Sequence, residues 1–285
     1  MATNNQKVVL ITGCSSGFGL VTAVRLAAHG HIVWATMRDL SRQGDLENKL
    51  AGRNAKAFIR ELDVTQPSTI KNVVEEIQRT HSQIDVLINN AGYGIGGFFE
   101  DLTEDEIRSQ MEVNFFGVQS VCREVIPLMR KYSKGKIINI SSIAGQMASP
   151  CLSAYNTSKW ALEALSESLY FEMSMFGISV VLVEPGSYPT NIFTQNAHYA
   201  KNFENPQSPY FSFSQKLKDI SKNYIKKLKK DPEDVAKLIE NIVNNSHPKL
   251  RYVSDFSSWL RIVAQKTLPP PLIAYVFRRF VNANK

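Results

Sequence analysis

The sequence predicts an α/β protein built on a doubly wound parallel sheet of about seven strands. Helices are expected on both faces of this sheet, together with a helical C-terminal extension. Short runs of Val, Ile and Leu recur along residues 1–190 and alternate with amphipathic stretches of helical length. A glycine-rich turn follows the first of these runs. Strands that are apolar at every position are typical of parallel sheets, whose two faces are both covered.

The chain is expected to form one domain over residues 1–285, because open sheets often reach this size. Its three cysteines are too scattered to suggest a disulfide framework or a metal site, which favours a reducing, cytoplasmic location. The N-terminus shows no signal-peptide pattern, and no run reaches the ~18 apolar residues of a membrane span.

The net charge of +7 belongs to the last third of the chain. Residues 1–200 carry 17 Lys and Arg against 19 Asp and Glu, whereas residues 201–285 carry 16 against 7. A solvated, Lys-rich helix face is the favoured interpretation. The alternative is weak peripheral contact with an anionic membrane, and no nucleic-acid partner is expected.

Residues 8–12 form the first expected strand, and residues 20–29 form the helix that follows it. Glycines in the turn between them let the backbone approach a pyrophosphate, and the helix N-terminus offers N–H groups and a positive dipole. The turn therefore predicts a dinucleotide site. Its residues are Gly13, Ser15, Ser16, Gly17, Phe18 and Gly19.

The second strand, residues 32–36, is followed by Arg38 and Asp39. An acid at this position usually binds the adenosine ribose 2′-hydroxyl, whereas an Arg accommodates a 2′-phosphate. A guanidinium suits phosphate well, so Arg38 favours NADP(H), with NAD(H) as the alternative. Arg38 could also be an ordinary surface charge.

The third strand, residues 57–62, ends at Asp63 and Val64, before a helix over residues 68–81. Asp63 has two equally good interpretations: it accepts from the adenine amino group, or it caps that helix. Residues 85–88 form the fourth strand.

Two asparagines follow the fourth strand, in the run Asn89-Asn90-Ala91-Gly92. Their side-chain amides can tie neighbouring strands together. Thr103 and Glu106 then give the capping signature of a long helix that contains Asn114. Asn is a mediocre helix former, and a buried amide needs partners, so Asn114 is a candidate for a polar relay.

The stretch of residues 135–159 carries the expected chemistry. It runs from an apolar strand through Ser141 and Ser142 to Tyr155 and Lys159. Helical spacing places Tyr155 and Lys159 on one face, roughly 6 Å apart at Cβ. A nearby ammonium lowers the pKa of a phenol from about 10, as general acid–base catalysis near neutrality requires. Ser142 lies at the end of the strand, where open sheets present ligands, and Ser141 is the alternative.

Residues 178–183 form the sixth expected strand, which is followed by Pro185, Gly186 and Thr190. With these pieces in place, residues 5–190 resemble the short-chain dehydrogenase/reductase family of Rossmann-fold oxidoreductases. Five motifs in the family's order carry the resemblance: Thr12-Gly13-x-x-x-Gly17-x-Gly19, Asn89-Asn90-Ala91-Gly92, Asn114, Ser142 with Tyr155-x-x-x-Lys159, and Pro185-Gly186 with Thr190.

The resemblance implies catalytic roles for four residues. Tyr155 would exchange a proton with the substrate oxygen, and Lys159 would lower its pKa and bond the nicotinamide ribose. Ser142 would orient and polarise the carbonyl, and Asn114 would hold a water in the proton relay. The residues expected to contact the cofactor are Gly13, Ser15, Ser16, Gly17, Phe18, Gly19, Arg38, Asp63, Val64, Asn90, Ala91, Gly92, Tyr155, Lys159, Pro185, Gly186 and Thr190.

Residues 34–40 resemble the hydroxysteroid and retinol dehydrogenases of the family, in the branch with 17β-hydroxysteroid dehydrogenase type 1 and the photoreceptor retinol dehydrogenase. In that branch the Arg goes with NADP(H). Residues 187–213 hold seven aromatic side chains, and residues 187–230 are expected to cover a lipophilic, steroid- or retinoid-like alcohol or ketone. A packed minor core or a dimer surface explains the aromatics equally well.

The C-terminal part is expected to contain a Lys-rich segment over residues 216–230, a helix over 231–243 and a seventh, edge strand over 250–254. Residues 255–285 read as a basic, partly amphipathic extension. Packing on the domain is favoured, with membrane contact or closure of the substrate pocket as alternatives.

The favoured function is an NADP(H)-dependent oxidoreductase that transfers hydride to or from a lipophilic alcohol or ketone. A catalytically silent scaffold or redox sensor is the alternative, although it has no need for intact Ser142, Tyr155 and Lys159. A sugar-nucleotide epimerase is a weaker third option. The family resemblance also implies a homodimer or homotetramer formed through long helices.

Overall fold

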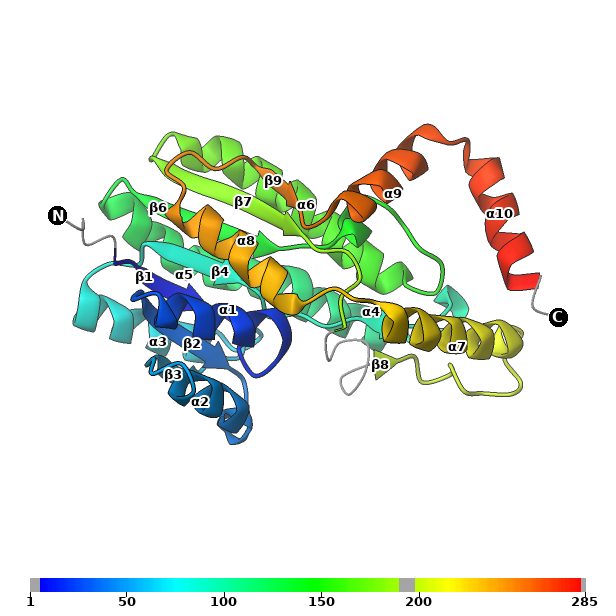
Figure 1. Cartoon of the computed structure of the whole chain (residues 1–285), viewed down its shortest axis with the longest axis horizontal. Helices are drawn as coiled ribbons and strands as arrows, with labels where there is room; N and C mark the ends of the chain where they lie inside the picture. The colour runs from blue at the N-terminus through cyan, green and yellow to red at the C-terminus, as the bar shows by residue number, and fades with distance from the viewer. Residues whose placement is uncertain (1–5, 190–197, 283–285) are drawn as a thin grey trace.

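A seven-stranded parallel sheet runs through the centre of the molecule in the computed structural model, which describes residues 6–189 and 198–282 (Figure 1). The strand order is β3-β2-β1-β4-β6-β7-β9, so the winding direction reverses between β1 and β4. This confirms the predicted doubly wound sheet and its edge strand β9. The strands are β1 Val8–Ile11, β2 Ile32–Met37, β3 Phe58–Glu61, β4 Val86–Asn89, β6 Gly135–Ile140, β7 Ile178–Glu184 and β9 Arg251–Val253.

Helices cover both faces of the sheet. Successive residues of a strand point to opposite sides, so each apolar strand contributes side chains to a core on both faces. In β1, Val9 and Ile11 join the core that α1 and α8 cover, whereas Val8 and Leu10 join the core beneath α3, α5 and α6. The first face carries α1 Gly17–Ala28, α2 Gly44–Ala51 and α8 Pro232–Asn244, and the second carries α3 Pro67–His81, α5 Gly117–Lys131 and α6 Ser153–Ser174.

Several sequence-based boundaries are shifted. The first helix begins at Gly17 rather than at residue 20, so the last glycines of the turn belong to it. The expected long helix divides into α4 Glu104–Met111, a π-helical turn η3 Glu112–Phe116, and α5. Its capping box at Thr103 and Glu106 is confirmed. The helix α2 and the short helix η1 Leu40–Arg42 were not expected.

Further elements complete the fold, and residues 198–227 and 256–282 form the end of the molecule to the right in Figure 1. A two-stranded sheet pairs β5 Ile95–Gly96 with β8 His198–Tyr199. The short helices η2 Phe99–Asp101 and η4 Ile143–Gly145 lie in the connections after β5 and β6. The remaining helices are α7 Phe211–Lys227, α9 Phe256–Thr267 and α10 Pro270–Asn282.

The C-terminal extension packs on the domain through α9, as favoured from the sequence. Ile262 of α9 joins a small core with Ile143 and Met147. Gln265 donates to the Ala148 carbonyl oxygen at 2.9 Å, and Lys266 donates to Gln146 Oε1 at 2.6 Å. The extension therefore holds the loop that follows β6.

Candidate active site

One cavity of about 1690 Å³ lies at the carboxyl ends of the strands. Single ligand pockets usually span about 300–1,000 Å³, so this cavity has room for two adjoining ligands. Thr190 lies outside the described residues, and Gly19 and Asn114 do not line the cavity. The other sequence candidates all line it: Gly13, Ser15, Ser16, Gly17, Phe18, Arg38, Asp63, Val64, Asn90, Ala91, Gly92, Ser142, Tyr155, Lys159, Pro185 and Gly186.

The turn between β1 and α1 packs so tightly that two of its glycines have no room for a side chain. Gly13 has a φ of +74°, and a Cβ there would lie 2.8 Å from Ala91 Cα. A Cβ on Gly19 would lie 2.4 Å from the Gly13 carbonyl oxygen. The residue before α1, Ser16, does not cap this helix with its own side chain. The turn therefore presents backbone N–H groups and the positive end of a helix to the cavity.

Two arginines lie where β2 ends. Arg38 is exposed and lines the cavity, and Arg42 of η1 lines it as well. The neighbouring acid is engaged elsewhere: Asp39 Oδ1 accepts from Ser41 N at 3.0 Å and from Ser41 Oγ at 2.6 Å. Asp39 is not among the lining residues. Sequence reasoning missed Arg42, although its position four residues after Arg38 was a usable signal.

Asp63 does not cap the following helix, so that interpretation was wrong. The residue before α3 is Gln66, and Pro67 occupies its first turn. The Asp63 carboxylate instead folds its own turn by accepting from the Thr65 backbone N–H at 2.9 Å and from its hydroxyl at 2.8 Å. Its place in the cavity wall leaves the adenine interpretation open.

The asparagine pair after β4 ties strands together, as predicted. Asn89 Nδ2 donates to Asn139 Oδ1 at 2.8 Å, across the β4–β6 pairing. Asn90 Nδ2 donates to the carbonyl oxygens of Thr12 and Gly13, both at 2.9 Å. Asn90 therefore fixes the start of the glycine turn, which makes it a structural support of the cavity floor.

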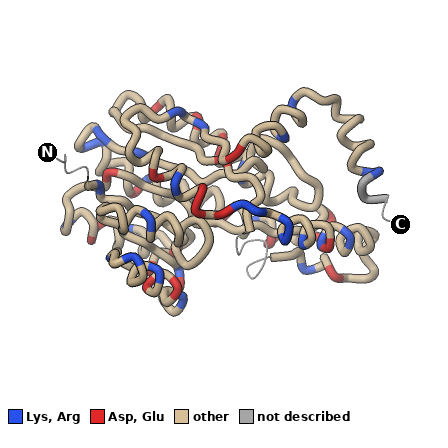
Figure 2. Tube along the Cα trace, in the orientation of Figure 1, with Lys and Arg blue, Asp and Glu red and all other residues tan. Residues whose placement is uncertain are grey.

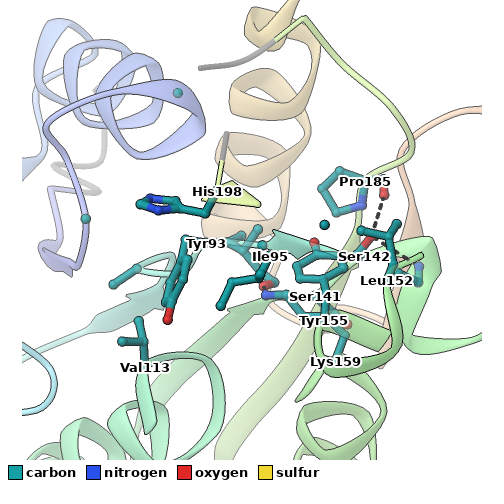
Figure 3. A pocket seen from close by; sticks show the side chains of 18 of the residues that line it. Tyr93, Ile95, Val113, Ser141, Ser142, Leu152, Tyr155, Lys159, Pro185 and His198 are labelled. Carbon is teal, nitrogen blue, oxygen red and sulfur yellow. Dashed lines mark hydrogen bonds between the residues drawn. The ribbon is translucent and has the colours of Figure 1, made fainter. Parts of the chain in front are cut away.

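Tyr155, Lys159 and Ser142 meet on one side of the cavity (Figure 3). The Lys159 ammonium lies 5.9 Å from the centre of the Tyr155 ring and donates to the Ile140 carbonyl oxygen at 2.8 Å. Ser142 Oγ accepts from Ala144 N at 3.1 Å, and its hydroxyl contacts the Pro185 oxygen at 3.5 Å. A phenol, an ammonium and a hydroxyl therefore face one space, as general acid–base chemistry on a carbonyl requires.

The pKa values of the pair differ from the sequence-based expectation. Burial raises the pKa of the Tyr155 phenol, and a hydrogen bond with Ser142 only partly opposes this. Burial also lowers the pKa of Lys159 to about 8, against the attraction of Glu163. A lowered phenol pKa was expected from the nearby ammonium. Desolvation is the largest cause of both shifts, because both groups lie inside the protein.

The two serines at the end of β6 face different surroundings. Ser142 is hydrogen bonded to Tyr155, which contributes to the pKa of that phenol. Ser141 lies beside Glu163: a Cβ added to Gly145 would come within 2.9 Å of Ser141 Oγ and 2.8 Å of Glu163 Cγ. The geometry thus favours Ser142 over Ser141 as the serine that acts with Tyr155.

Asn114 sits in the π-helical turn η3, fully buried. Its Oδ1 accepts from Tyr93 N at 3.1 Å, and its Nδ2 donates to Tyr93 O at 2.9 Å and to Ser158 Oγ at 3.0 Å. These contacts satisfy the amide and clamp the loop after β4 to α6. The π-turn, which frequently occurs at functional sites, carries a residue that sequence periodicity treats as ordinary helix.

Beyond these candidates, the far wall of the cavity comes from residues that the sequence did not single out. Tyr93 and His198 pack edge to face, with ring centres 5.1 Å apart (Figure 3). His198 is brought there by the β5–β8 pairing, a long-range contact without a local sequence signal. Further lining residues come from the C-terminal helices: Leu217, Lys218, Ile220, Ser221, Tyr224, Arg261 and Phe277.

The aromatic side chains of residues 187–213 that the structure describes differ in their exposure. Tyr188 and Phe203 are each only 2% exposed and form packed core, whereas Tyr199 is partly exposed and lines the cavity with them. Phe193 lies outside the described residues. The expected minor core is therefore confirmed for Tyr188 and Phe203, whereas a cover over a lipophilic substrate stays a prediction.

The comparisons with known proteins identify the family. A family model described as short chain dehydrogenase matches residues 7–200. The 3-ketodihydrosphingosine reductase of Bacteroides thetaiotaomicron is 38% identical over 96% of this chain and 97% of its own length. Bovine retinol dehydrogenase 8 is 31% identical over 95% of this chain and 88% of its own.

A crystal structure of a short-chain dehydrogenase from Streptomyces avermitilis superposes with a TM-score of 0.79 at 31% identity, covering 98% of each chain. The match to this structure thus extends over nearly the whole chain, including the part after β7. The chain belongs to the short-chain dehydrogenase/reductase family of oxidoreductases.

Proposed function

We propose that the chain is an NADP(H)-dependent oxidoreductase that interconverts a lipophilic alcohol and its carbonyl compound. The observation that carries this proposal is the grouping of Tyr155, Lys159 and Ser142 in a cavity with room for a dinucleotide and a substrate. The glycine turn fits a pyrophosphate, because its glycines let the backbone come close to a ligand and the N-terminus of α1 offers backbone N–H groups. When bound, the nicotinamide supplies the hydride or accepts it.

The residues of the chain manage the proton and the orientation. The Tyr155 hydroxyl holds the proton that the substrate oxygen gains on reduction, and the Ser142 hydroxyl orients that oxygen. Lys159 provides a fixed positive charge and holds the nicotinamide ribose. Asn114 keeps the Tyr93 backbone in place through its hydrogen bonds, which supports a role in positioning the water of a proton relay.

The two arginines after β2 support a preference for NADP(H) over NAD(H). Arg38 and Arg42, four residues apart in the chain, both line the cavity, and a 2′-phosphate would need such cations. Asp39, which could otherwise bind a free ribose hydroxyl, is occupied by Ser41. Asp63 and Val64 remain proposed contacts of the adenine end.

A lipophilic substrate is supported by the apolar walls of the outer cavity. Its lining includes Leu217, Ile220, Tyr224 and Phe277 from the C-terminal helices. The names of two relatives point in the same direction, since a ketodihydrosphingosine and retinol are both lipids. We therefore propose 3-ketodihydrosphingosine, retinal and a steroid ketone as the first substrates for assay.

Tyr155→Phe tests the proposed reaction. Removal of the proton donor is expected to lower kcat by about 10²–10⁴-fold while the Kd for NADPH stays unchanged. Tyr170→Phe, at an exposed position of the same helix, is the matched control and should keep full turnover. NADPH oxidation with each ketone measures kcat, and quenching of NADPH fluorescence measures Kd.

Full turnover by Tyr155→Phe would contradict the proposed role of this residue. If the wild-type protein binds NADPH but turns over none of the substrates, the silent scaffold becomes the better interpretation. A preference for a small polyol would remove the lipophilic substrate alone. The cytoplasmic location remains a prediction. Assembly as a homodimer or homotetramer also remains a prediction, which sedimentation velocity can test.

A further inference from the structure

We propose that the cavity opens onto a surface that docks on an anionic lipid bilayer, so that a lipophilic substrate passes from the bilayer into the site. The substrate part of this inference rests on the proposed function, whereas the docking itself does not. The C-terminal docking surface consists of exposed residues on α7, α9 and α10. They are Phe213, Lys222, Lys226, Lys227, Phe256, Trp259, Leu260, Leu272, Tyr275, Val276, Arg278 and Arg279.

Exposed apolar side chains gather on these helices. Of the nineteen large apolar side chains exposed among the described residues, nine lie after residue 210. Phe256 is 74% exposed, Val276 57% and Leu260 52%. Single exposed apolar residues are ordinary, but a group on adjoining helices marks a surface that binds a partner.

The helix α10 has one side toward the protein and another toward solvent. Ile273 and Phe277, four residues apart, are partly buried, and Phe277 lines the cavity. Leu272, Tyr275 and Val276 are exposed. Figure 1 shows α9 and α10 projecting from the body at the end that also holds α7. The outward side of α10 therefore has no cover within the described part of the chain.

Basic residues accompany the apolar ones. Lys222, Lys226 and Lys227 are exposed on α7, and Arg278 and Arg279 are exposed on α10. Figure 2 shows the lysines of α7 in blue. Apolar and basic side chains together are typical of helices that lie in the plane of an anionic membrane surface.

The combination of basic and apolar side chains favours an anionic bilayer over other partners. A second copy of the chain would place the same basic surface against itself, which repels. Nucleic acid would satisfy the lysines and arginines but would offer no partner to aliphatic Leu272 and Val276. An anionic bilayer satisfies both groups. No helix among residues 6–189 and 198–282 is long and apolar enough to cross a membrane, so the contact would be in the plane of the surface.

The same three helices also line the cavity, which connects the docking surface with the site. Leu217, Ile220 and Tyr224 of α7, Arg261 of α9 and Phe277 of α10 all contribute to its wall. A substrate dissolved in the acyl region would meet apolar side chains from the bilayer inward. Docking would therefore let the substrate enter the cavity without first dissolving in water.

Vesicle co-sedimentation of the full chain tests the docking. The vesicles contain phosphatidylcholine with or without about 25% phosphatidylserine. We expect binding only with phosphatidylserine, and weaker binding at higher salt. The triple variant Lys222→Glu/Lys226→Glu/Lys227→Glu should bind at least about tenfold more weakly. Lys49→Glu/Arg53→Glu/Lys56→Glu, on and after α2, makes the same change in net charge and should bind like the wild type.

A second readout addresses the route of the substrate. The α7 triple variant should lose turnover of a ketone held in phosphatidylserine vesicles and keep turnover of the same ketone in detergent. Unchanged NADPH binding shows that both triple variants are folded. Because sedimentation needs no substrate, an inactive enzyme that still docks would contradict the proposed function and leave the docking intact.

Three results would overturn the inference. The wild-type protein could stay in the supernatant at low salt, or the two triple variants could lose binding equally. Finally, the α7 triple variant could change the mass of the protein in sedimentation velocity without changing vesicle binding, which would assign the surface to self-association. Equal turnover from vesicles and detergent by this variant would overturn the route alone.

Discussion

Burial controls the titration of the residues in and around the site. It raises the pKa of Tyr155, lowers that of Lys159 to about 8, and raises that of Glu184 to about 7. Glu163 lies one helical turn after Lys159 and partly offsets the cost of burying that ammonium. The acid–base pair is therefore positioned by α6 and β6, while desolvation sets its protonation in this structure.

Glu184 should make stability depend on pH. Burial and nearby Glu163 raise its pKa to about 7 from 4.5, although Gln146, Arg251 and Lys266 oppose the shift. Between these two values the folded protein keeps a proton that the unfolded chain releases, so the free energy of unfolding falls as pH rises. In the Glu184→Gln variant, the free energy of unfolding should therefore decrease by about 1–3 kcal/mol less than in the wild type over this pH range.

Urea unfolding at pH 5 and pH 8 measures the difference for each protein. Glu167→Gln, at a half-exposed carboxylate that also pairs with Arg251, is the control and should follow the wild type. If the free energies of unfolding of Glu184→Gln and of the wild type change by the same amount between pH 5 and pH 8, the buried carboxyl does not titrate in this range.

Arg38 should decide the choice of cofactor. Arg38→Ala removes a cation from the proposed 2′-phosphate site, and we expect the Kd for NADPH to rise about 10–100-fold with little change for NADH. Arg53→Ala, at an exposed position after α2, should change neither value. Fluorescence titration with both nucleotides is the measurement. Equal weakening of NADPH and NADH would show that Arg38 supports the site without reading the phosphate.

At the scale of elements, the turn between β1 and α1 depends on its neighbour β4. Thr12 Oγ1 accepts from the backbone N–H groups of Asn90 and Ala91, both at 3.0 Å. Asn90 in turn donates to the carbonyl oxygens of Thr12 and Gly13. The ends of β1 and β4 therefore stabilise each other, and the shape of the proposed pyrophosphate site depends on both.

Three glycines of the chain should respond differently to an added methyl group. Gly19→Ala would place Cβ 2.3 Å from Asn90 Nδ2 and 2.4 Å from the Gly13 oxygen, so we expect a loss of about 2 kcal/mol or more and of NADPH binding. Gly17→Ala meets no atom within 4 Å but has a φ of +58°, which predicts about 1 kcal/mol.

Gly44→Ala is the matched control, because an added Cβ meets nothing within 4 Å and its φ is not positive. It should be neutral or slightly stabilising. Urea unfolding and NADPH titration give both readouts. A Gly19→Ala protein that binds NADPH normally would contradict the inference that the nucleotide site depends on the packing of this turn against Asn90.

At the scale of the whole molecule, we single out two of the surfaces on which the described residues expose apolar side chains. One is the C-terminal docking surface. The other follows α6, where Trp160 is 50% exposed, Phe171 63% and Met175 75%. Residues 160 and 171 are eleven apart, which is close to three helical turns, so they share one stripe. We propose this stripe as the interface of the expected homodimer.

Trp160→Glu/Phe171→Glu should convert the proposed dimer to monomer, because two charges would be buried against the partner copy. Sedimentation velocity measures the mass. Phe256→Glu, at an exposed aromatic of α9, is the control and should remain dimeric. If the wild-type protein is already a monomer at micromolar concentration, the stripe is not an interface between copies.

The local sequence determined the strands, most of the helices and the spacing of Tyr155 and Lys159. These features follow from periodicity and from the hydrogen bonding of near neighbours, which a short stretch contains. Asn89 and Asn90 were likewise predictable as ties between strands, because parallel strands end at one edge of the sheet. The family motifs lie in these same regular parts.

Contacts between distant segments decided the rest. The pairing of β5 with β8 brings His198 to Tyr93, and the packing of α7 and α10 builds the outer cavity. Which serine faces Tyr155 depends on how the loop after β6 meets α6. Burial in the assembled domain reversed the expected direction of the Tyr155 pKa, because desolvation is set by all surrounding atoms and not by the residues next in the chain.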